Sequence, residues 1–318
     1  MNILFVTATR IGDAVLTSGL LAHLAESYPE ARITVACGPT AAPLFAAAPR
    51  VVRHIVLVKR RASLHWFDLW RACVTTRWDL IVDLRSTALA YLLVARRRRI
   101  YRRDRADEHR IYGLARVLGL ATPPAPRVWT TPRHEAEAIR LAPSGGPMLA
   151  LGPTANWRGK TWRAENFVAL IERLTGPDSI LPGARVAVFG AARQRPMAQP
   201  VLDAVPAGRL IDLVGRVDLP TAAAALRRCA LFIGNDSGLM HLAAAAGAPT
   251  LGLFGPSRAE HYAPWGSRAA VVQTEVPYED LYPRRHDRRT VDTLMESLSV
   301  DAVEQAAVEL WRRCAGAG

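Results

Sequence analysis

The stretch “GNDSGLMHLAAAAG”, Gly234 to Gly247, lies between two apolar runs, “ALFI” (230–233) and “APTLGLFG” (248–255). The flanking runs are typical of buried strands, and a helix is expected to begin close to Ser237. Strand, polar turn, helix and strand in this order form the repeating unit of a parallel sheet that helices cover on both faces. The stretch therefore predicts an α/β fold.

The same alternation continues along the chain in two blocks. The strand-like runs of the first block are “NILFVTA” (2–8), “ARITVAC” (31–37), “HIVLV” (54–58) and “WDLIVDLR” (78–85). Those of the second block are “MLALGPT” (148–154), “RVAVFG” (185–190), “RLIDLVG” (209–215), “ALFIGND” (230–236), “PTLGLFG” (249–255) and “AAVVQT” (269–274). A linker rich in Pro and Gly, “LAPSGGPM” (141–148), separates the blocks. We therefore expect two α/β domains, 1–143 and 148–298, and a closing helix in 299–318, for which packing back on the first domain is one expectation.

The length of 318 residues suits two domains of ordinary size, and the formal net charge is +13. Such a surplus favours phosphate-rich or anionic partners, and much of it lies in “VKRR” (58–61), “ARRRRIYRRDR” (95–105) and “YPRRHDRR” (282–289). The four cysteines are far apart and form no CxxC pair, which favours core positions over a zinc site or disulfides. Without a membrane-length apolar run or a leader pattern, the chain is expected to be cytoplasmic.

Residues Asp236 to Met240 follow a predicted strand and open a predicted helix. Open α/β sheets bind ligands at the carboxyl ends of their strands, where helix N-termini offer unbonded N–H groups and the positive end of the helix dipole. Gly238 allows close approach to the backbone, so successive N–H groups here could cradle a diphosphate. The alternative is that Ser237 only caps the helix and that His241 is an ordinary core or surface histidine.

Two further charged residues occupy comparable places. Asp13 stands at the start of a predicted helix, after a short loop that contains Gly12. It is either a structural acid at a helix N-terminus, worth ~0.3–1 kcal/mol, or a general base for an acceptor hydroxyl. Lys160 lies in the loop after the strand-like run “MLALG” (148–152). It is either solvated or placed to neutralise charge on a departing phosphate.

Three stretches together resemble a known family. They are “RIGDAVLTSGLLAHL” (10–24), “GKTWRAENFVALIERL” (159–174) and “FIGNDSGLMHLAAAAGAPTLGLFGPS” (232–257). They resemble the bacterial lipopolysaccharide heptosyltransferases of glycosyltransferase family 9, which use ADP-heptose. The order and the approximate spacing of the three stretches agree with that family over nearly the whole chain. The third stretch is the most specific of the three.

The resemblance implies an inverting enzyme that needs no metal or other cofactor. It also implies two Rossmann-like domains facing across a cleft, the arrangement called GT-B, with the acceptor bound by the first domain and the donor by the second. Asp13 matches the catalytic base and Lys160 matches the lysine that contacts the donor. The other donor-binding residues implied are Asp236 for the sugar hydroxyls, and Ser237, Gly238, Leu239, Met240 and His241 for the diphosphate.

The resemblance also bears on the region around Gln194 and on two basic segments. Where family members often have a glutamate for the ribose of the donor, this chain has “FGAARQRPMAQ” (189–199), with Gln194 near that place. The basic loop Lys59, Arg60 and Arg61 matches the loop after the family's third strand, and with Gly12 it is expected to bind an anionic acceptor of the Kdo–lipid A type. The run Arg96 to Arg99 is open between acceptor contact, a membrane-surface patch and a solvated face.

Two other classes of function are weighed against transfer. A polyanion-binding module would use the same positive charge, but the sequence has no recognisable element for reading nucleic acid, so no nucleic-acid partner is expected. A nucleotide-sugar epimerase, or a transferase of another sugar, is the alternative on a similar scaffold. The favoured prediction is heptose transfer from ADP-heptose to a lipopolysaccharide core hydroxyl, in the cytoplasm or peripherally at the inner face of the inner membrane.

Overall fold

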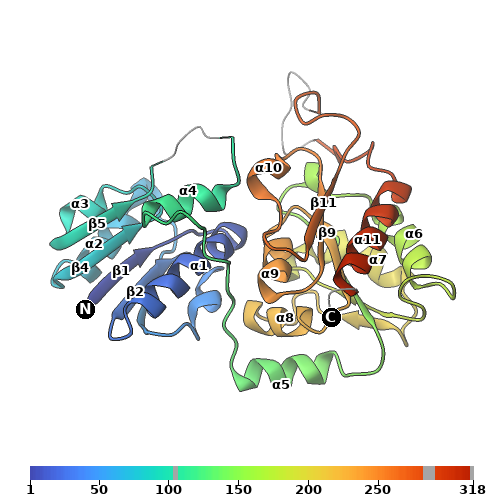
Figure 1. The fold of residues 1–318 in the computed structure, drawn as a ribbon, viewed down its shortest axis with the longest axis horizontal. Coiled ribbons are helices and arrows are strands. Elements are labelled where there is room, and N and C mark those ends of the chain that lie inside the picture. The colour runs from blue at the N-terminus through green and yellow to red at the C-terminus, as the bar shows by residue number, and fades with distance from the viewer. Residues whose placement is uncertain (103–106, 282–290, 316–318) are drawn as a thin grey trace. The chain divides into compact units, whose positions relative to one another are not determined.

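The computed structural model describes residues 1–102, 107–281 and 291–315, so the basic run 282–289 lies outside the described residues. The chain divides into two compact units, Met1–Trp129 and Thr130–Gly318. Each unit is a parallel sheet with helices packed on it, which confirms the predicted α/β class (Figure 1). Across the described ranges, no helix combines the length and the hydropathy that crossing a membrane requires.

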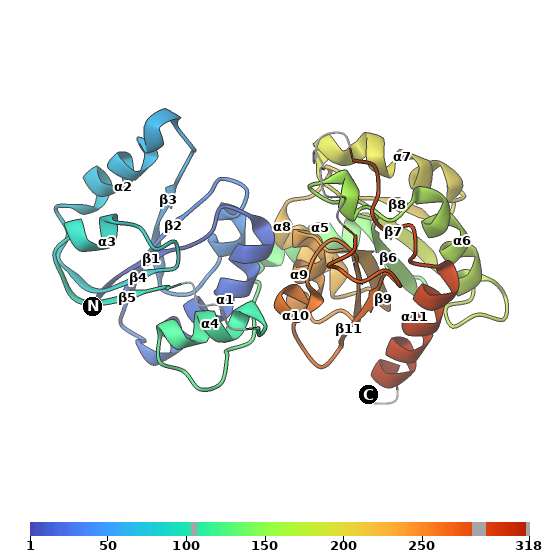
Figure 2. The same cartoon turned by 90° about the horizontal axis from the view of Figure 1, so that it is seen from above.

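The first unit is built on a five-stranded parallel sheet with the order β3-β2-β1-β4-β5. Its strands are β1 (Asn2–Val6), β2 (Arg32–Cys37), β3 (Val51–Val56), β4 (Trp78–Asp83) and β5 (Ala95–Ile100). Its helices are α1 (Ile11–Ser27), α2 (His65–Cys73), α3 (Leu89–Leu92) and α4 (Arg110–Val117), with short turns η1 (Ala42–Phe45) and η2 (Arg61–Ser63). Figure 2 shows α2 and α3 on one face of this sheet and α1 and α4 on the other.

The second unit contains a six-stranded parallel sheet with the order β11-β10-β9-β6-β7-β8. Its strands are β6 (Met148–Gly152), β7 (Arg185–Val188), β8 (Leu210–Asp212), β9 (Leu231–Asn235), β10 (Thr250–Phe254) and β11 (Ala269–Gln273). Its helices are α5 (Pro132–Leu141), α6 (Ala164–Thr175), α7 (Arg195–Ala204), α8 (Leu219–Leu226), α9 (Gly238–Ala246), α10 (Ala259–Tyr262) and α11 (Val300–Ala315), with turns η3 (Arg158–Lys160) and η4 (Ala192–Gln194).

In both sheets the order in which the chain adds strands reverses at the first strand of the unit. In the first unit the chain moves outward from β1 to β3 and then returns to place β4 on the other side of β1. The second unit repeats this, because β9 lies beside β6 after the chain has formed β7 and β8. This is the strand order of Rossmann folds, in which ligands bind at the carboxyl edge where the order reverses. Asp13 follows β1, Lys160 follows β6 and Asp236 follows β9, so each lies at such a point.

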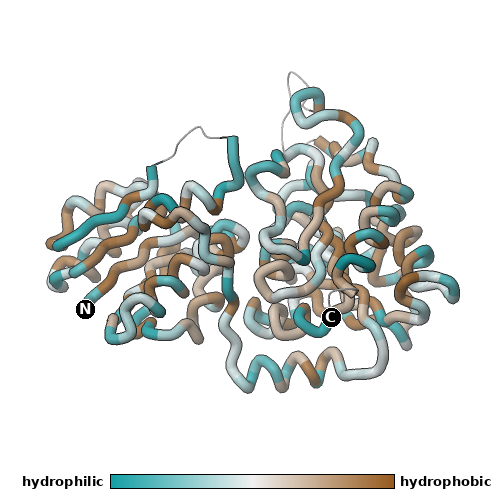
Figure 3. The backbone as a smooth tube through the Cα atoms, viewed as in Figure 1, coloured by the Kyte–Doolittle hydropathy of each residue, from teal (hydrophilic) through white to brown (hydrophobic). Residues whose placement is uncertain are grey.

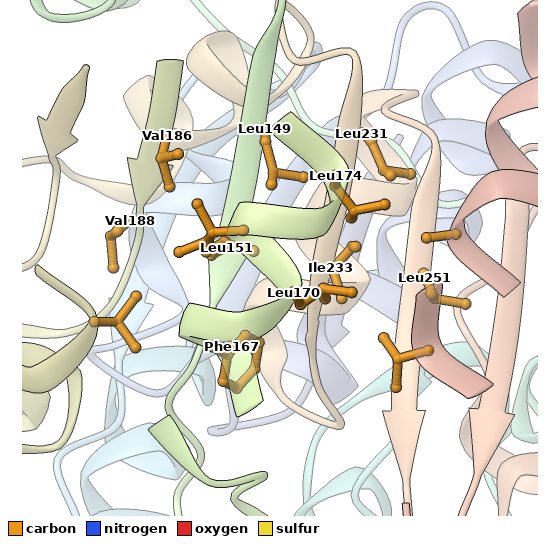
Figure 4. Packing of buried hydrophobic residues seen from close by; sticks show 14 of the residues in the cluster. Leu149, Leu151, Phe167, Leu170, Leu174, Val186, Val188, Leu231, Ile233 and Leu251 are labelled. Atoms are coloured by element: carbon orange, nitrogen blue, oxygen red, sulfur yellow. The ribbon is translucent and has the colours of Figure 1, made fainter. Parts of the chain in front are cut away.

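The hydrophobic core of the second unit stabilises its sheet. Alternate residues of a strand point to one face, and residues three and four apart share one side of a helix. Accordingly, strand residues such as Leu149 and Leu151 meet Phe167, Leu170 and Leu174 of α6 (Figure 4). Full burial of such side chains contributes about 1.5–3 kcal/mol each. This core holds β6 and β9, and therefore the loops that follow them, in fixed positions.

The division between the units falls earlier than the predicted linker. Helix α5, which the sequence analysis assigned to the first domain, packs on α8 of the second unit. Ala138 of α5 is fully buried there, and Arg227 bonds both Thr130 (2.9 Å) and Glu135 (3.2 Å). The boundary therefore lies at residues 129 and 130, and the Pro- and Gly-rich segment 141–148 is a loop within the second unit.

The closing helix α11 packs on its own unit. Val303, Ala307 and Leu310 are buried in the same core as β9 and β10, and α11 also packs on α6 and β11. Ser299 caps it as expected, because the N–H of Ala302 donates to its Oγ at 3.2 Å. The apolar side of this helix, for which packing on the first domain was an expectation, is thus buried within the second unit.

Three cysteines, Cys37, Cys73 and Cys229, are buried, as predicted for core residues, whereas Cys314 is half-buried. Burial raises the pKa of the Cys73 thiol to about 11, so this thiol is protonated at neutral pH and is a poor nucleophile. Among the residues that the structure describes, no group of His, Cys, Asp and Glu side chains is arranged to hold a metal ion.

Candidate active site

The carboxyl edge of the second sheet brings Lys160 and Asp236 together. Nζ of Lys160 donates a hydrogen bond to Oδ2 of Asp236, and the two form an ion pair. The Asp236 side chain is 9% exposed and that of Lys160 is 23% exposed, so water reaches the pair mainly from the lysine side. The two residues lie far apart in sequence and meet because their loops follow the neighbouring strands β6 and β9.

The backbone around Lys160 is anchored on two sides. The N–H of Trp162 donates to Oδ1 of Asn235 at the end of β9 (3.0 Å), and its indole Nε1 donates to the carbonyl of Leu298 (2.8 Å). The N–H of Leu294 donates to the carbonyl of Gly159 (2.9 Å). Lys160 is therefore held in place before a ligand binds, which is the condition for effective electrostatic stabilisation of a reacting group.

Ser237 precedes α9 but does not cap it through its side chain. Its backbone is extended, no cap hydrogen bond forms, and its buried Oγ has no hydrogen-bond partner within the described part of the chain. The capping interpretation of this side chain is therefore wrong. An unsatisfied buried hydroxyl costs about 1–3 kcal/mol. This hydroxyl and the first N–H groups of α9, at Gly238 and Leu239, are suited to a ligand rich in acceptors, such as a diphosphate.

The side chains of the next residues of α9 are largely packed inside the unit. The Met240 side chain is fully buried and lies close to Gly252 of β10, so only its backbone N–H remains for the predicted donor contact. Leu239 is half-buried, with its side chain close to Gly152. His241 is buried and 5% exposed. The N-terminus of α9 therefore presents backbone groups on top of a packed apolar interior.

Gln194 ties two loops together at the same edge of the sheet. Its Oε1 accepts hydrogen bonds from Oγ1 of Thr154 and from the N–H of Ala191, both at 3.1 Å. Its Nε2 donates to the carbonyl of Ala155 at 2.9 Å. The side chain thus positions the loops that follow β6 and β7. Its predicted contact with the donor's ribose stays a prediction.

Asp13 lies in the first turn of α1, at the carboxyl edge of the first sheet, next to Gly12. Its Oδ1 faces Nε of Arg110 at 3.6 Å, and the two side chains are 26% and 30% exposed. Arg110 begins α4, and its guanidinium also lies 5.7 Å from the ring centre of Tyr101. Asp13 is therefore a partly exposed carboxylate beside a cation. Sequence reasoning missed Arg110, because no spacing pattern connects it with Asp13.

A second acid at this edge has a structural role. Asp83 ends β4 and is fully buried. Its carboxylate accepts hydrogen bonds from the N–H of Arg85 (2.8 Å) and from the N–H and Oγ1 of Thr87 (2.7 and 2.6 Å). The turn after β4 is thereby closed next to the loop after β1. These bonds occupy both carboxylate oxygens of Asp83, so Asp13 is the better candidate for a base.

The predicted acceptor residues Lys59, Arg60 and Arg61 are exposed and follow β3. β3 is two strands from β1, or about 10 Å across the sheet, so this loop belongs to the same edge as Asp13. Arg60 is partly neutralised by Asp68, whose Oδ2 lies 2.8 Å from its Nη1. Acceptor binding by this loop stays a prediction.

A sequence profile of glycosyltransferase family 9 (heptosyltransferase) matches residues 66–286. The chain belongs to glycosyltransferase family 9. The matched region contains Lys160, Asp236 and all of α9, whereas Asp13 precedes it. Membership of family 9 makes the chain a glycosyltransferase, as the resemblance implied.

Individual members of family 9 are similar over most of the chain. Lipooligosaccharide heptosyltransferase 2 of Haemophilus influenzae is 25% identical over 311 residues, which cover 86% of this chain and 88% of that protein. A family 9 glycosyltransferase structure from Veillonella parvula has a TM-score of 0.79 at 21% identity and covers 98% of this chain and 97% of its own. The structure of Escherichia coli ADP-heptose lipopolysaccharide heptosyltransferase II has a TM-score of 0.77 at 19% identity, with coverages of 98% and 99%. These structures share the GT-B fold, which confirms the predicted fold class.

Proposed function

We propose that this glycosyltransferase moves heptose from ADP-heptose to a hydroxyl of the lipopolysaccharide core. The observation that carries the proposal is the Lys160–Asp236 pair beside Ser237 at the N-terminus of α9, whose Oγ has no hydrogen-bond partner among the described residues. A cation, a carboxylate and unbonded amides at one place suit a sugar diphosphate better than a neutral ligand. The names of the relatives support heptose as the sugar and ADP as the nucleotide.

In the proposed reaction the second unit binds the donor. The amides that open α9 and the hydroxyl of Ser237 bind the diphosphate, and Asp236 accepts hydrogen bonds from the sugar hydroxyls. As the bond between the anomeric carbon and the diphosphate oxygen breaks, negative charge grows on the departing ADP. Lys160 and the dipole of α9 are already oriented to stabilise that charge. The Lys160 side chain is the more exposed member of its pair, which supports a contact with a ligand from that side.

We propose that Asp13 is the general base. It takes the proton of the acceptor hydroxyl while that oxygen attacks the anomeric carbon from the face opposite ADP, so the configuration is inverted. Its partial exposure supports access by a hydroxyl, and Arg110 provides a counter-charge for the carboxylate. Because Lys160 and the helix N-terminus supply positive charge to the leaving group, we propose that no divalent cation is needed.

The proposed acceptor is an anionic, lipid-linked oligosaccharide at the inner face of the inner membrane. The basic loop Lys59 to Arg61, at the same sheet edge as Asp13, supports binding of its carboxylate or phosphate groups. The formal charge of +13 is consistent with such a partner.

A transfer assay tests this function. The protein is mixed with ADP-heptose or other nucleotide sugars and with a deacylated Kdo-containing acceptor, and ADP release and product mass are measured. We expect ADP release only with the acceptor, a gain of one heptose in the product, inverted anomeric configuration by NMR, and an unchanged rate in EDTA. An altered sugar without acceptor would indicate an epimerase. Strong retention on heparin, with neither transfer nor an effect of ADP-sugars on stability, would favour a polyanion-binding module.

A further inference from the structure

The run Arg96 to Arg99, which the sequence left open, is an edge strand. These residues form most of β5, which, among the strands that the structure describes, pairs with β4 alone. An edge strand tolerates charged side chains, which also discourage pairing with another chain. Figure 3 shows β5 as a hydrophilic run beside the hydrophobic strands of the same sheet.

The side chains of β5 divide between the two faces of the sheet. Arg98 pairs with Ile81, which lies in the core beneath α2 and α3, so Arg96 and Arg98 point to that face. Arg98 is used internally, since its guanidinium donates to the carbonyls of Ala90 and Leu93 at 2.7 Å each. Arg96 is free to extend: its side chain is 83% exposed, and Asp79 is 4.0 Å away.

Large apolar side chains are exposed on the same face. In α3 and the turn after it, Tyr91, Leu92 and Val94 are each about two-thirds exposed (64%, 66% and 64%). In α2, Phe67 is 56% exposed, and Leu64 just before the helix is 47% exposed. Of the thirteen large hydrophobic side chains that are exposed among the described residues, only Ile139 and Val276 belong to the second unit.

These apolar side chains form one surface. Phe67 stacks on Trp70 with ring centres 5.6 Å apart, and the indole N–H of Trp70 donates to the carbonyl of Leu92 (3.3 Å). Helices α2 and α3 therefore adjoin on one face of the sheet, as Figure 2 also shows. The hydrogen bonds from Trp70 and Arg98 to backbone carbonyls hold α3 and the turn after it in place. The side chains of Tyr91, Leu92 and Val94 nevertheless face water. We call the surface formed by Leu64, Phe67, Tyr91, Leu92, Val94, Arg71 and Arg96 the α2–α3 face.

The charge around the α2–α3 face is positive. From residue 51 to residue 100 the chain has eleven Lys and Arg but three Asp and no Glu. Of these eleven, Arg97 and Arg99 of β5 point to the other face of the sheet. Asp83 is buried, Asp68 pairs with Arg60, and Asp79 accepts from the N–H of Asn2 (2.8 Å) and lies near Arg96. Arg71 is one turn beyond Phe67 on α2 and is exposed, like Arg96. Exposed apolar side chains flanked by arginines match the chemistry of an anionic lipid surface, where the apolar groups enter the interface and the cations meet the headgroups.

We propose that the α2–α3 face docks the enzyme on an anionic phospholipid membrane. The proposal rests on the proposed function in one respect, namely that a lipid-linked acceptor is reached from such a surface. Two other occupants fit less well. A second copy of the chain would bring two positive surfaces together, which is unfavourable. A nucleic acid would satisfy the arginines but would leave Leu92 and Val94, both aliphatic, without a suitable partner.

Vesicle binding without donor or acceptor tests this proposal. The full chain is sedimented with vesicles of phosphatidylcholine alone or mixed with phosphatidylglycerol. We expect binding to the mixed vesicles that weakens with added salt and little binding to the neutral ones. Phe67→Ser/Leu92→Ser should weaken binding by roughly tenfold or more, because the inserted apolar area is lost. Arg71→Glu/Arg96→Glu should weaken it to a similar extent, ~1 decade, and should reduce the salt dependence.

Ile139→Ser provides the matched control, since Ile139 is 49% exposed but belongs to the second unit. This variant should bind vesicles like the wild type. Thermal unfolding checks that all variants are folded, and Phe67→Ser/Leu92→Ser should keep full turnover on the deacylated, water-soluble acceptor. If the wild type fails to bind mixed vesicles, or if both double variants bind as it does, the docking proposal is wrong. Binding to heparin without binding to vesicles would also overturn it. Vesicle binding without any heptose transfer would instead overturn the proposed function alone.

Discussion

Replacing Asp13 by alanine is expected to lower kcat for heptose transfer by about a thousandfold, within the range of general-base contributions. The acceptor hydroxyl then attacks without a group to take its proton. Donor binding should change little, because the residues proposed for it lie on the second unit. Steady-state kinetics with saturating ADP-heptose, together with calorimetric titration of ADP, separates the two effects.

The alternative interpretation of Asp13, as an acid that only stabilises a helix N-terminus, predicts a different outcome. Loss of such an acid costs about 0.3–1 kcal/mol of stability and leaves the rate nearly unchanged. Glu165 is a suitable control because it too is an acid in the first turn of a helix, α6, and its side chain is exposed. Glu165→Ala should retain full turnover. Equal rates for the Asp13 and Glu165 variants would show that Asp13 is not the base.

Replacing Lys160 by methionine is expected to lower kcat by at least a hundredfold, the usual loss when a preorganised charge at a leaving group is removed. It should also lower the free energy of unfolding by about 2–3 kcal/mol, because the carboxylate of Asp236 is left largely buried without its counter-ion. Adding Asp236→Asn removes the stranded charge, so the double variant should recover stability but not activity. Urea unfolding and kinetics on the same samples measure both.

Lys160→Arg sharpens this test. The chain contains only two lysines, Lys59 and Lys160, among 41 basic residues. Arginine keeps the positive charge but replaces a compact ammonium with a larger, planar guanidinium. The ion pair with Asp236 should therefore survive, while the contact with the diphosphate is displaced. We expect near wild-type stability with kcat reduced by about tenfold or more. Full activity of the methionine variant would exclude Lys160 from the reaction.

Most of the fold could be predicted because buried strands carry their own signal. The apolar runs at β1, β6 and β9 are short and followed by turns, and those at β1 and β9 also contain β-branched and aromatic residues. β5 was missed because four successive arginines lack that signal, and such a strand is possible only at an edge, which depends on the sheet order. The unit boundary was misplaced because α5 looks the same in sequence whichever unit it packs on.

The candidate site could be predicted residue by residue but not as a set of contacts. Asp236 and Lys160 were each singled out by their places after strands, whereas their ion pair follows from β9 lying beside β6. That the Oγ of Ser237 has no hydrogen-bond partner in the described part of the chain could not be foreseen, since serine before a helix usually caps it. Arg110 gave no signal at all. The scarcity of lysine in an arginine-rich chain is a clue to Lys160 that composition did offer.

We propose that an activated sugar binds where the second sheet reverses its strand order. A crystal structure of the protein with ADP would locate the diphosphate. We expect it against the N–H groups of Gly238 and Leu239, with Ser237 Oγ and Lys160 Nζ within hydrogen-bond distance. ADP bound at any other edge, such as the carboxyl ends of β1 and β4, would contradict the proposal.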